Sequence, residues 1–293
     1  MSEATPFSLR IFVVDGDPDG LRVVDRTNWN GKALVFPRPL LPKVKQRPEF
    51  AQTGVYLLLG PREDGEGEKL YVGEGDPVRP RLEKHYVEKE FWSRAIFFVA
   101  GEGQLNKAHV QYLESQLIKR AKAAKRLPLD NGNAPTEPTL SEPDRAYVEV
   151  FLDHMLGMLP ALGVQAFEQV AEVSAGSSFA LLTCSGKGVK ATGYESTKGF
   201  VVKAGSQAVG VTVPSMKEHV RGMYDLREDL IKNGVLATSG DQFVFSQDYA
   251  FSSPSTAAAV LLGRSANGRI EWKDHQNRTL KELQESQANL GGA

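Results

Sequence analysis

Two tyrosines, an arginine, a histidine and a glutamate follow one another within a short part of the chain. They are Tyr56, Tyr71, Arg81, His85 and Glu114. A phenol can handle the proton of a water molecule, a guanidinium can neutralise charge on a phosphoryl group, and a carboxylate can hold a hard cation. Together these groups are suited to the metal-assisted hydrolysis of a phosphodiester.

Short apolar runs must position these residues. Residues 55–59 and 70–72 are rich in β-branched and aromatic side chains, which predicts two strands joined by the polar loop 60–68. A third run at 95–99 completes a three-stranded antiparallel sheet. Residues 78–90 are charged with scattered apolar positions and should form a helix, where the four-residue spacing of Arg81 and His85 puts both on one face.

Glu114 lies in a longer predicted helix, residues 105–126. Apolar residues recur there at helical spacing, and the glutamate stands beside that stripe. A carboxylate next to a buried stripe is costly unless it is paired or holds a metal ion. This setting is compatible with a functional role for Glu114.

These elements, in this order, resemble the GIY-YIG nuclease superfamily. The name-giving triplets are Gly54-Val55-Tyr56 and Tyr71-Val72-Gly73, Arg81 and His85 follow, and Glu114 stands in Leu113-Glu114-Ser115-Gln116-Leu117-Ile118. The resemblance implies an α+β module that hydrolyses DNA with Mg²⁺ or Mn²⁺. It also implies that Tyr56 or Tyr71 handles the proton of water, Arg81 stabilises the transition state, His85 positions phosphate or water, and Glu114 binds the metal. The family resemblance of its surroundings favours the functional role of Glu114 over a structural one.

Each of these residues also has an ordinary structural explanation. Tyr56 and Tyr71 could cover the edge of a core, and Arg81 could form a surface ion pair with Glu83 or Asp76. A protein with a decayed site would be a catalytically silent DNA-binding or protein-interaction module on the same scaffold. The joint presence of the arginine and the glutamate favours the enzyme.

The end of the helix that carries Glu114 is strongly basic. More cations cluster there than are needed to complement the helix dipole, so we expect contacts with the DNA backbone. The cations are Lys119, Arg120, Lys122, Lys125 and Arg126. Asn131 and Asn133 follow, either as substrate contacts or as parts of a plain turn.

The flanking sequences predict further segments. Apolar runs at 12–14, 21–24 and 33–36 indicate a small β unit, and the proline-rich stretch 37–48 indicates an extended basic connector. Residues 135–143 have linker composition, and 144–173 have a helical pattern. We therefore expect an N-terminal β unit and connector (1–50), a nuclease domain (51–134), a linker with a helix (135–176) and a second α+β domain (177–293).

In that second domain, strands are expected at 179–184, 189–194, 200–202 and 243–245, and a helix at 215–232. It resembles an uncharacterised domain often joined to GIY-YIG modules in bacterial proteins. Its patterns around 253–259 and 263–273 are similar to those of domains thought to bind DNA. This makes Arg264, Asn267, Arg269 and Trp272 candidate DNA contacts; the equal alternative is a turn-rich motif with a packed tryptophan.

Composition sets the remaining bounds. The chain has 293 residues, a formal net charge of −1 and one cysteine, Cys184, which is expected in the core. A single cysteine excludes a disulfide framework and a cysteine-rich zinc site. Without a secretory signal or a long apolar stretch, a cytoplasmic protein with no membrane partner is expected. No motif indicates an organic cofactor, and the oligomeric state is left open.

Overall fold

The computed structural model describes residues 6–62, 67–101, 104–132, 135–168, 180–197 and 199–290. The chain forms two compact units, Met1–Gln169 and Val170–Ala293. Both units contain antiparallel sheets and helices, so the expected α+β class is confirmed at that level. In the described residues, no helix combines the length and apolar character needed to cross a membrane.

The N-terminal unit is built on one six-stranded sheet of order β1-β2-β3-β6-β4-β5. All neighbouring strands are antiparallel, and β5 forms one edge. The strands are β1 (Leu9–Val13), β2 (Arg22–Arg26), β3 (Gly31–Pro37), β4 (Gly54–Pro61), β5 (Glu68–Gly75) and β6 (Arg94–Ala100).

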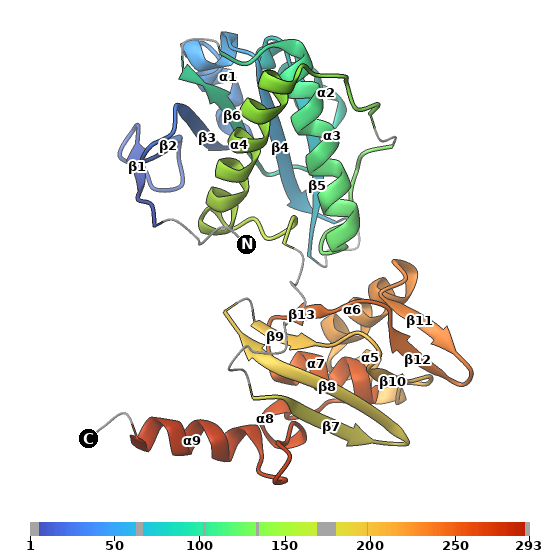
Figure 1. Ribbon diagram of the computed structural model, residues 1–293. Coiled ribbons are helices and arrows are strands. Elements are labelled where there is room, and N and C mark those ends of the chain that lie inside the picture. Colours follow the sequence, from blue (N-terminus) through green and yellow to red (C-terminus); the bar gives the residue numbers. More distant parts are fainter. Residues whose placement is uncertain are drawn as a thin grey trace. The chain divides into compact units, whose positions relative to one another are not determined.

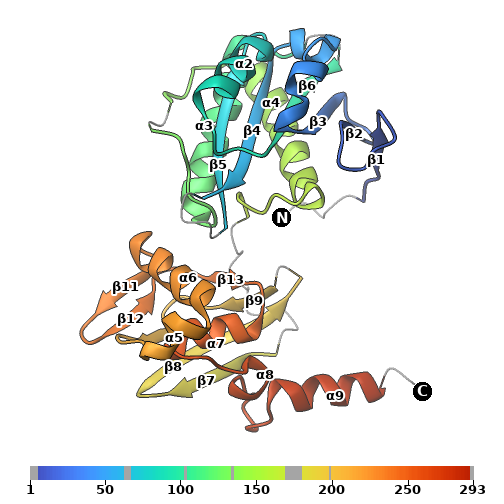
Figure 2. The same cartoon turned by 180° about the vertical axis from the view of Figure 1, so that it is seen from behind.

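Helices and turns cover both faces of this sheet (Figures 1 and 2), and each face carries its own core. Helices α3 (Lys107–Ala124) and α4 (Glu142–Met158), followed by the 3₁₀ turn η4 (Leu159–Leu162), cover one face. The other face carries η1 (Arg38–Leu40), α1 (Leu41–Val44), η2 (Pro48–Ala51) and α2 (Val78–Glu88). Helix α2 and helix α3 therefore approach β4 and β5 from opposite sides.

The three strands and two helices expected around the site are present, but the sheet is larger than the expected three strands. Strand β3 pairs with β6, so the N-terminal strands continue the same sheet instead of forming a unit of their own. The reason is that Ala33, Leu34, Val35 and Phe36 are all buried, which requires cover on both faces of β3. The proline-rich stretch was expected to be extended, but it folds into short helical turns.

Helix α4 also belongs to this unit. Its apolar side chains join the core formed by α3 and the sheet; they are Val148, Phe151, Leu152 and Met155. The predicted helical stretch ends earlier than expected, at Met158, and residues 169–179 lie outside the described part of the chain. The structure therefore does not separate residues 51–134 from their flanks.

The C-terminal unit contains two antiparallel sheets, one of order β13-β9-β8-β7 and one of order β10-β12-β11. The strands are β7 (Leu182–Gly186), β8 (Val189–Ser196), β9 (Gly199–Val202), β10 (Gln207–Val209), β11 (Leu236–Ser239), β12 (Gln242–Phe245) and β13 (Tyr249–Phe251). The helices are α5 (Pro214–His219), α6 (Arg221–Lys232), α7 (Pro254–Leu262), α8 (Gly268–Glu271) and α9 (Leu280–Leu290).

Helix α7 is the centre of the C-terminal core. Every residue from Ala257 to Leu262 is buried, which explains why this stretch lacks the polar face of a surface helix. Cys184 is also buried, as expected. The helix expected over 215–232 is divided in two at Val220, whose backbone is not helical.

Candidate active site

The five residues singled out in the sequence come from four elements that meet around the edge strand β5. Tyr56 lies on β4 and Tyr71 on β5, while α2 supplies Arg81 and His85, and α3 supplies Glu114. Strand β5 is the last strand of the sheet, and residues 128–131 bond to its outer edge at Leu70 and Val72. Beyond that segment, groups from both faces of the sheet can interact around the end of β5.

Tyr56 is completely buried and lies across Gly73 of the paired strand. A Cβ at Gly73 would lie 2.4 Å from the Tyr56 hydroxyl oxygen. Only glycine leaves room for the phenol at this register, which gives the two triplets a common physical explanation. Arg81 and Tyr71 lie near enough to interact with the hydroxyl, but no group in the described residues forms a hydrogen bond of ordinary geometry with it. A buried hydroxyl without a hydrogen bond destabilises the fold by about 1–3 kcal/mol, so its unused hydrogen-bonding capacity needs an explanation.

Tyr71 and His85 form an aromatic cluster with Tyr56. The ring centroids of Tyr71 and His85 are 4.8 Å apart in an edge-on arrangement, and the two tyrosine rings are stacked at 6.3 Å. His85 is buried, and neither of its ring nitrogens has a partner among the described residues. Burial, with the nearby Lys89 and Arg81, lowers the pKa of His85 to about 4. Its imidazole is therefore neutral at pH 7 and can donate one hydrogen bond and accept another.

Arg81 is the cation of this cluster. Burial opposes its charge, but Tyr56, Tyr71 and Glu74 outweigh that effect and raise the pKa of Arg81 above its ordinary value. The ordinary ion-pair partners are otherwise engaged, since Glu83 binds Lys45 at 2.8 Å and Asp76 accepts from Thr53 at 2.6 Å. Within the described chain, Arg81 thus faces the tyrosines instead of closing a surface ion pair.

The same electrostatics act on the two phenols. Burial raises the pKa of Tyr56 strongly and that of Tyr71 in the same direction, and Arg81 opposes the shift in both. Both hydroxyls therefore stay protonated unless further positive charge approaches. A role as proton acceptor requires such a charge, while a role in orienting water does not.

Glu114 occupies the α3 side of the cluster. Its neighbours Leu113, Leu117 and Ile118 are buried, and the glutamate itself is partly buried. Burial and the proximity of Glu74 raise the pKa of Glu114 to about 7, although Arg81 and Lys107 act in the opposite direction. A carboxylate held in this way gains from a nearby cation.

These residues are compatible with a magnesium site that has few protein ligands. The described residues contain no group of three or more histidine, cysteine, aspartate and glutamate side chains in position to hold a metal ion. Mg²⁺ commonly uses only one or two protein carboxylates and completes its shell with water and substrate phosphate. Glu114 supplies such a carboxylate, and the open Tyr56 hydroxyl supplies a partner for water in the same cluster.

One consequence of the buried imidazole can be measured directly. The pKa of His85 is lower in the folded state than its ordinary 6.5, so at acidic pH the unfolded chain binds a proton that the folded protein does not. This proton binding stabilises the unfolded state relative to the folded state. The free energy of unfolding should therefore be unaffected by His85 above pH 6.5 and should fall by about 2 kcal/mol as the pH approaches 4. Urea unfolding of His85→Leu should lack this loss; the same acid dependence in both proteins would contradict the assignment. His275→Leu, which removes an exposed imidazole, is the control.

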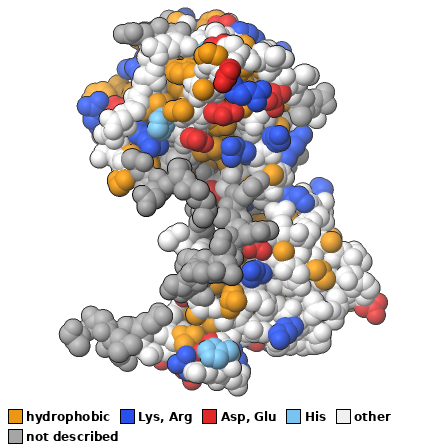
Figure 3. Space-filling view, viewed as in Figure 1, with side chains coloured by type: hydrophobic (Ala, Val, Ile, Leu, Met, Phe, Trp, Pro, Cys, Tyr) orange, Lys and Arg blue, Asp and Glu red, His pale blue; other side chains and the backbone are white. Residues whose placement is uncertain are grey.

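Within the described residues, only some of the cations at the basic end of α3 are exposed and free to contact DNA. Lys119, Arg120 and Lys122 are exposed, and no ion pair joins them to the described residues. Arg126 donates to the backbone oxygen of Glu168 at 3.3 Å, and Lys125 has the left-handed conformation that ends the helix. On the face of the N-terminal unit that carries α3 and α4, Lys and Arg are interspersed with Asp and Glu (Figure 3).

Asn131 has a structural explanation. Its side-chain amide donates to the backbone oxygen of Val72 at 2.7 Å and accepts from the backbone N–H of Val72 at 3.0 Å. These two bonds occupy the exposed edge of β5 next to Tyr71, as a further strand would. Asn133 lies outside the described residues.

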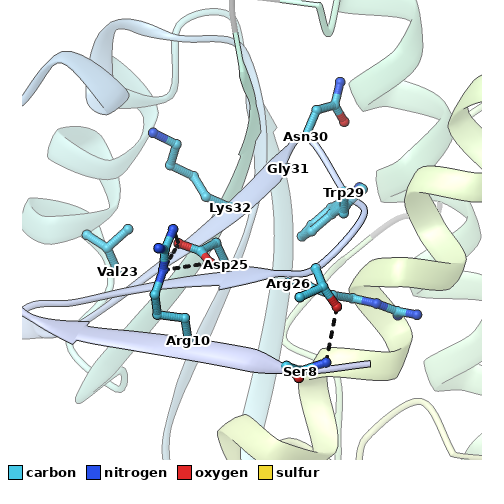
Figure 4. A pocket seen from close by; sticks show the side chains of 10 residues that line it. Ser8, Arg10, Val23, Asp25, Arg26, Trp29, Asn30, Gly31 and Lys32 are labelled. Atoms are coloured by element: carbon cyan, nitrogen blue, oxygen red, sulfur yellow. Dashed lines mark hydrogen bonds and ion pairs between the residues drawn. The ribbon is translucent and has the colours of Figure 1, made fainter. Parts of the chain in front are cut away.

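A separate hollow of about 450 Å³ lies at the far end of the same sheet (Figure 4). Its lining includes Arg10, Asp25, Trp29 and Lys32, and Arg10 and Asp25 form an ion pair at 2.9 Å. Strands β6 and β4 separate β3 from β5, and none of the predicted site residues lines this hollow. No sequence pattern indicates this hollow, because its residues come from three strands and the turn between β2 and β3 and share no motif.

The candidate DNA contacts of the C-terminal unit are bonded within the unit. Trp272 is fully buried, packs on Phe200 at 4.5 Å and donates from its indole nitrogen to the backbone oxygen of Pro254 at 3.0 Å. It presents no ring face to a base. Asn267 caps α8 through the backbone N–H of Arg269, as helix starts require.

The two arginines are also engaged. Arg264 binds Glu271 at 2.7 Å, and Arg269 donates to Gln284 at 2.9 Å. The serine, proline and glycine residues of the 253–259 and 263–273 patterns pack against one another in one junction. In this junction the backbone N–H of Gly268 donates to the hydroxyl of Ser255 at 3.0 Å. The turn-rich structural alternative therefore accounts for this pattern.

That junction should tolerate no side chain at Gly268. A Cβ there would lie 2.1 Å from the carbonyl carbon of Pro254, which is backbone and cannot move freely. Gly268→Ala should destabilise the C-terminal unit by about 2–4 kcal/mol. Gly132→Ala, where a Cβ meets nothing within 4 Å, is the matched control in thermal and urea unfolding. Equal stability of the two variants would show that the junction is loosely packed.

Comparison with known proteins bears on the C-terminal unit. A family model described as a domain of unknown function (DUF4357) matches residues 182–284. The matched range begins at β7 and ends within α9, and it contains the junction of Trp272, Gly268 and Pro254. Searches of curated proteins and of solved structures gave no match.

Proposed function

We propose that this protein is a GIY-YIG-type endonuclease that hydrolyses DNA with one divalent metal ion, Mg²⁺ or Mn²⁺. The observation that carries the proposal is the convergence of Tyr56, Tyr71, Arg81, His85 and Glu114 around the edge of β5. Two of these side chains are buried with polar atoms left unbonded in the described structure. Such costs are tolerated where a substrate or water completes the bonds.

The chain's own groups divide the chemistry between them. The Tyr56 hydroxyl orients the attacking water, with Tyr71 as the alternative, and His85 holds the water or a phosphate oxygen through a neutral imidazole nitrogen. The Arg81 guanidinium neutralises charge that grows on the phosphoryl oxygens. Glu114 holds the metal ion, which when bound supplies positive charge to the leaving oxygen.

DNA binding in this proposal uses the exposed part of the basic helix end. Lys119, Arg120 and Lys122 lie on the last turns of the helix that also carries Glu114. Contacts of this kind are independent of sequence and weaken with salt. The C-terminal residues Arg264, Asn267 and Trp272 are bonded within their own unit, and this proposal gives them no role.

The test is an incubation of the full chain with labelled single-stranded, duplex, branched and methylated DNA. Cleavage is expected with Mg²⁺ or Mn²⁺ and not with a chelator. The full chain is needed because a fragment of residues 1–134 would lack α4 and expose the core that α4 covers. Binding without cleavage of any substrate would favour the catalytically silent module instead.

A further inference from the structure

Glu74 is a carboxylate that the proposed function has not used. It follows Gly73 directly on β5, and only 8% of the residue is exposed. Lys107, at the start of α3, donates to both of its oxygens at 2.5 and 2.7 Å. No sequence pattern indicates this pair, because the two residues are far apart in the chain and share no motif.

The pair lies beside the proposed metal ligand. Lys107 and Glu114 are seven residues apart on α3, so both lie on one face of that helix, and Lys107 joins that face to Glu74 of β5. In keeping with this placement, Glu74 raises the pKa of Glu114 and Lys107 opposes that shift. The unbonded Tyr56 hydroxyl lies against Gly73, the residue before Glu74. Two carboxylates and one ammonium thus lie on the α3 side of β5, and the buried Tyr56 hydroxyl reaches Gly73 from the α2 side of the same strand.

We propose that Glu74 is a second carboxylate ligand of the divalent cation held by Glu114, and that Lys107 is its counter-ion in the metal-free protein. This inference rests on the proposed function. Without a cation, two neighbouring carboxylates at a partly dry site repel, and the Lys107 ammonium offsets that repulsion. A divalent cation does so more strongly and brings its own preference for carboxylate oxygens.

The positions of the two side chains suit this exchange. The side chain of Glu74 is 11% exposed and fixed on a strand, whereas that of Lys107 is 51% exposed. The lysine can therefore turn into solvent on its flexible stem without disturbing the core, while the carboxylate stays in place. The number of protein carboxylates then becomes two, which is within the range usual for Mg²⁺.

The test measures Mn²⁺ binding to the full chain by titration calorimetry and by the electron paramagnetic resonance signal of free Mn²⁺, without DNA. Glu74→Gln should weaken Mn²⁺ binding about tenfold, and Lys107→Met should strengthen it about threefold. Glu83→Gln is the control for the first change, since it also breaks a lysine ion pair, to Lys45 at 2.8 Å. Lys119→Met is the control for the second, because it removes an exposed cation farther along α3.

Each outcome has a defined meaning. Mn²⁺ affinity of Glu74→Gln within twofold of the unaltered protein would overturn the assignment of Glu74. Weaker binding by Lys107→Met would overturn the counter-ion role, because it would show that the lysine holds the carboxylate in place for the metal. If Glu114→Gln also leaves Mn²⁺ binding unchanged, the failure lies in the proposed function itself and not only in this inference.

Discussion

Glu114→Gln should abolish metal-dependent DNA cleavage, with a loss of at least about 1,000-fold in rate. The substitution keeps the volume of the side chain but removes the charge that holds the cation. Rates are to be compared at saturating Mg²⁺ on the substrate that the unaltered protein cleaves best. Undiminished cleavage would exclude Glu114 as the metal ligand.

The same variant has a second, independent readout. Because the pKa of Glu114 is raised to about 7, its protonated form is favoured by folding, and stability is lost as the pH rises from 4.5 through 7. At pH 8 without metal, Glu114→Gln should therefore be more stable than the unaltered protein by about 1 kcal/mol, a value reduced for partial solvent exposure. An inactive variant with this increased stability would show that activity is lost through the missing metal ligand and not through unfolding.

Much of the candidate site could be predicted because it depends on local patterns. The strands that carry Tyr56 and Tyr71 are apolar runs with turn residues between them, and the helix that carries Glu114 has apolar residues at helical spacing. The helix that carries Arg81 is charged, and its prediction rests on scattered apolar positions between two strands. Glu74, by contrast, could not be predicted. Its environment is set by Lys107, and that pairing depends on how the start of α3 meets the end of β5.

The six-stranded sheet could not be predicted from the sequence for a similar reason. Strands β1 to β3 have the pattern of a small independent sheet, and only the pairing of β3 with β6 makes them part of the larger one. In the C-terminal unit, the glycine and tryptophan pattern was compatible with both a binding surface and a packed junction. Trp272 is packed in the core, and burial is a property of the tertiary structure that the pattern alone does not reveal.

Arg81→Ala should lower the rate of cleavage by about 100-fold or more and change DNA affinity far less. The guanidinium lies beside the two phenols, where charge develops in the proposed reaction, whereas it is only one of several cations available to the backbone. Single-turnover rates and equilibrium binding, the latter measured in a chelator, give the two quantities separately. Arg81→Lys should recover only part of the rate, because an ammonium cannot make the paired contacts of a guanidinium.

Lys84→Ala is the matched control, since it removes an exposed cation from the same helix, where Lys84 pairs with Glu88 at 3.8 Å. Its rate should stay within about threefold of the unaltered protein, because a surface ion pair contributes little. If Arg81→Ala lost affinity and rate in equal measure, Arg81 would only anchor the DNA. If both variants lost rate alike, the effect would come from the net charge of α2, and no transition-state role would remain for Arg81.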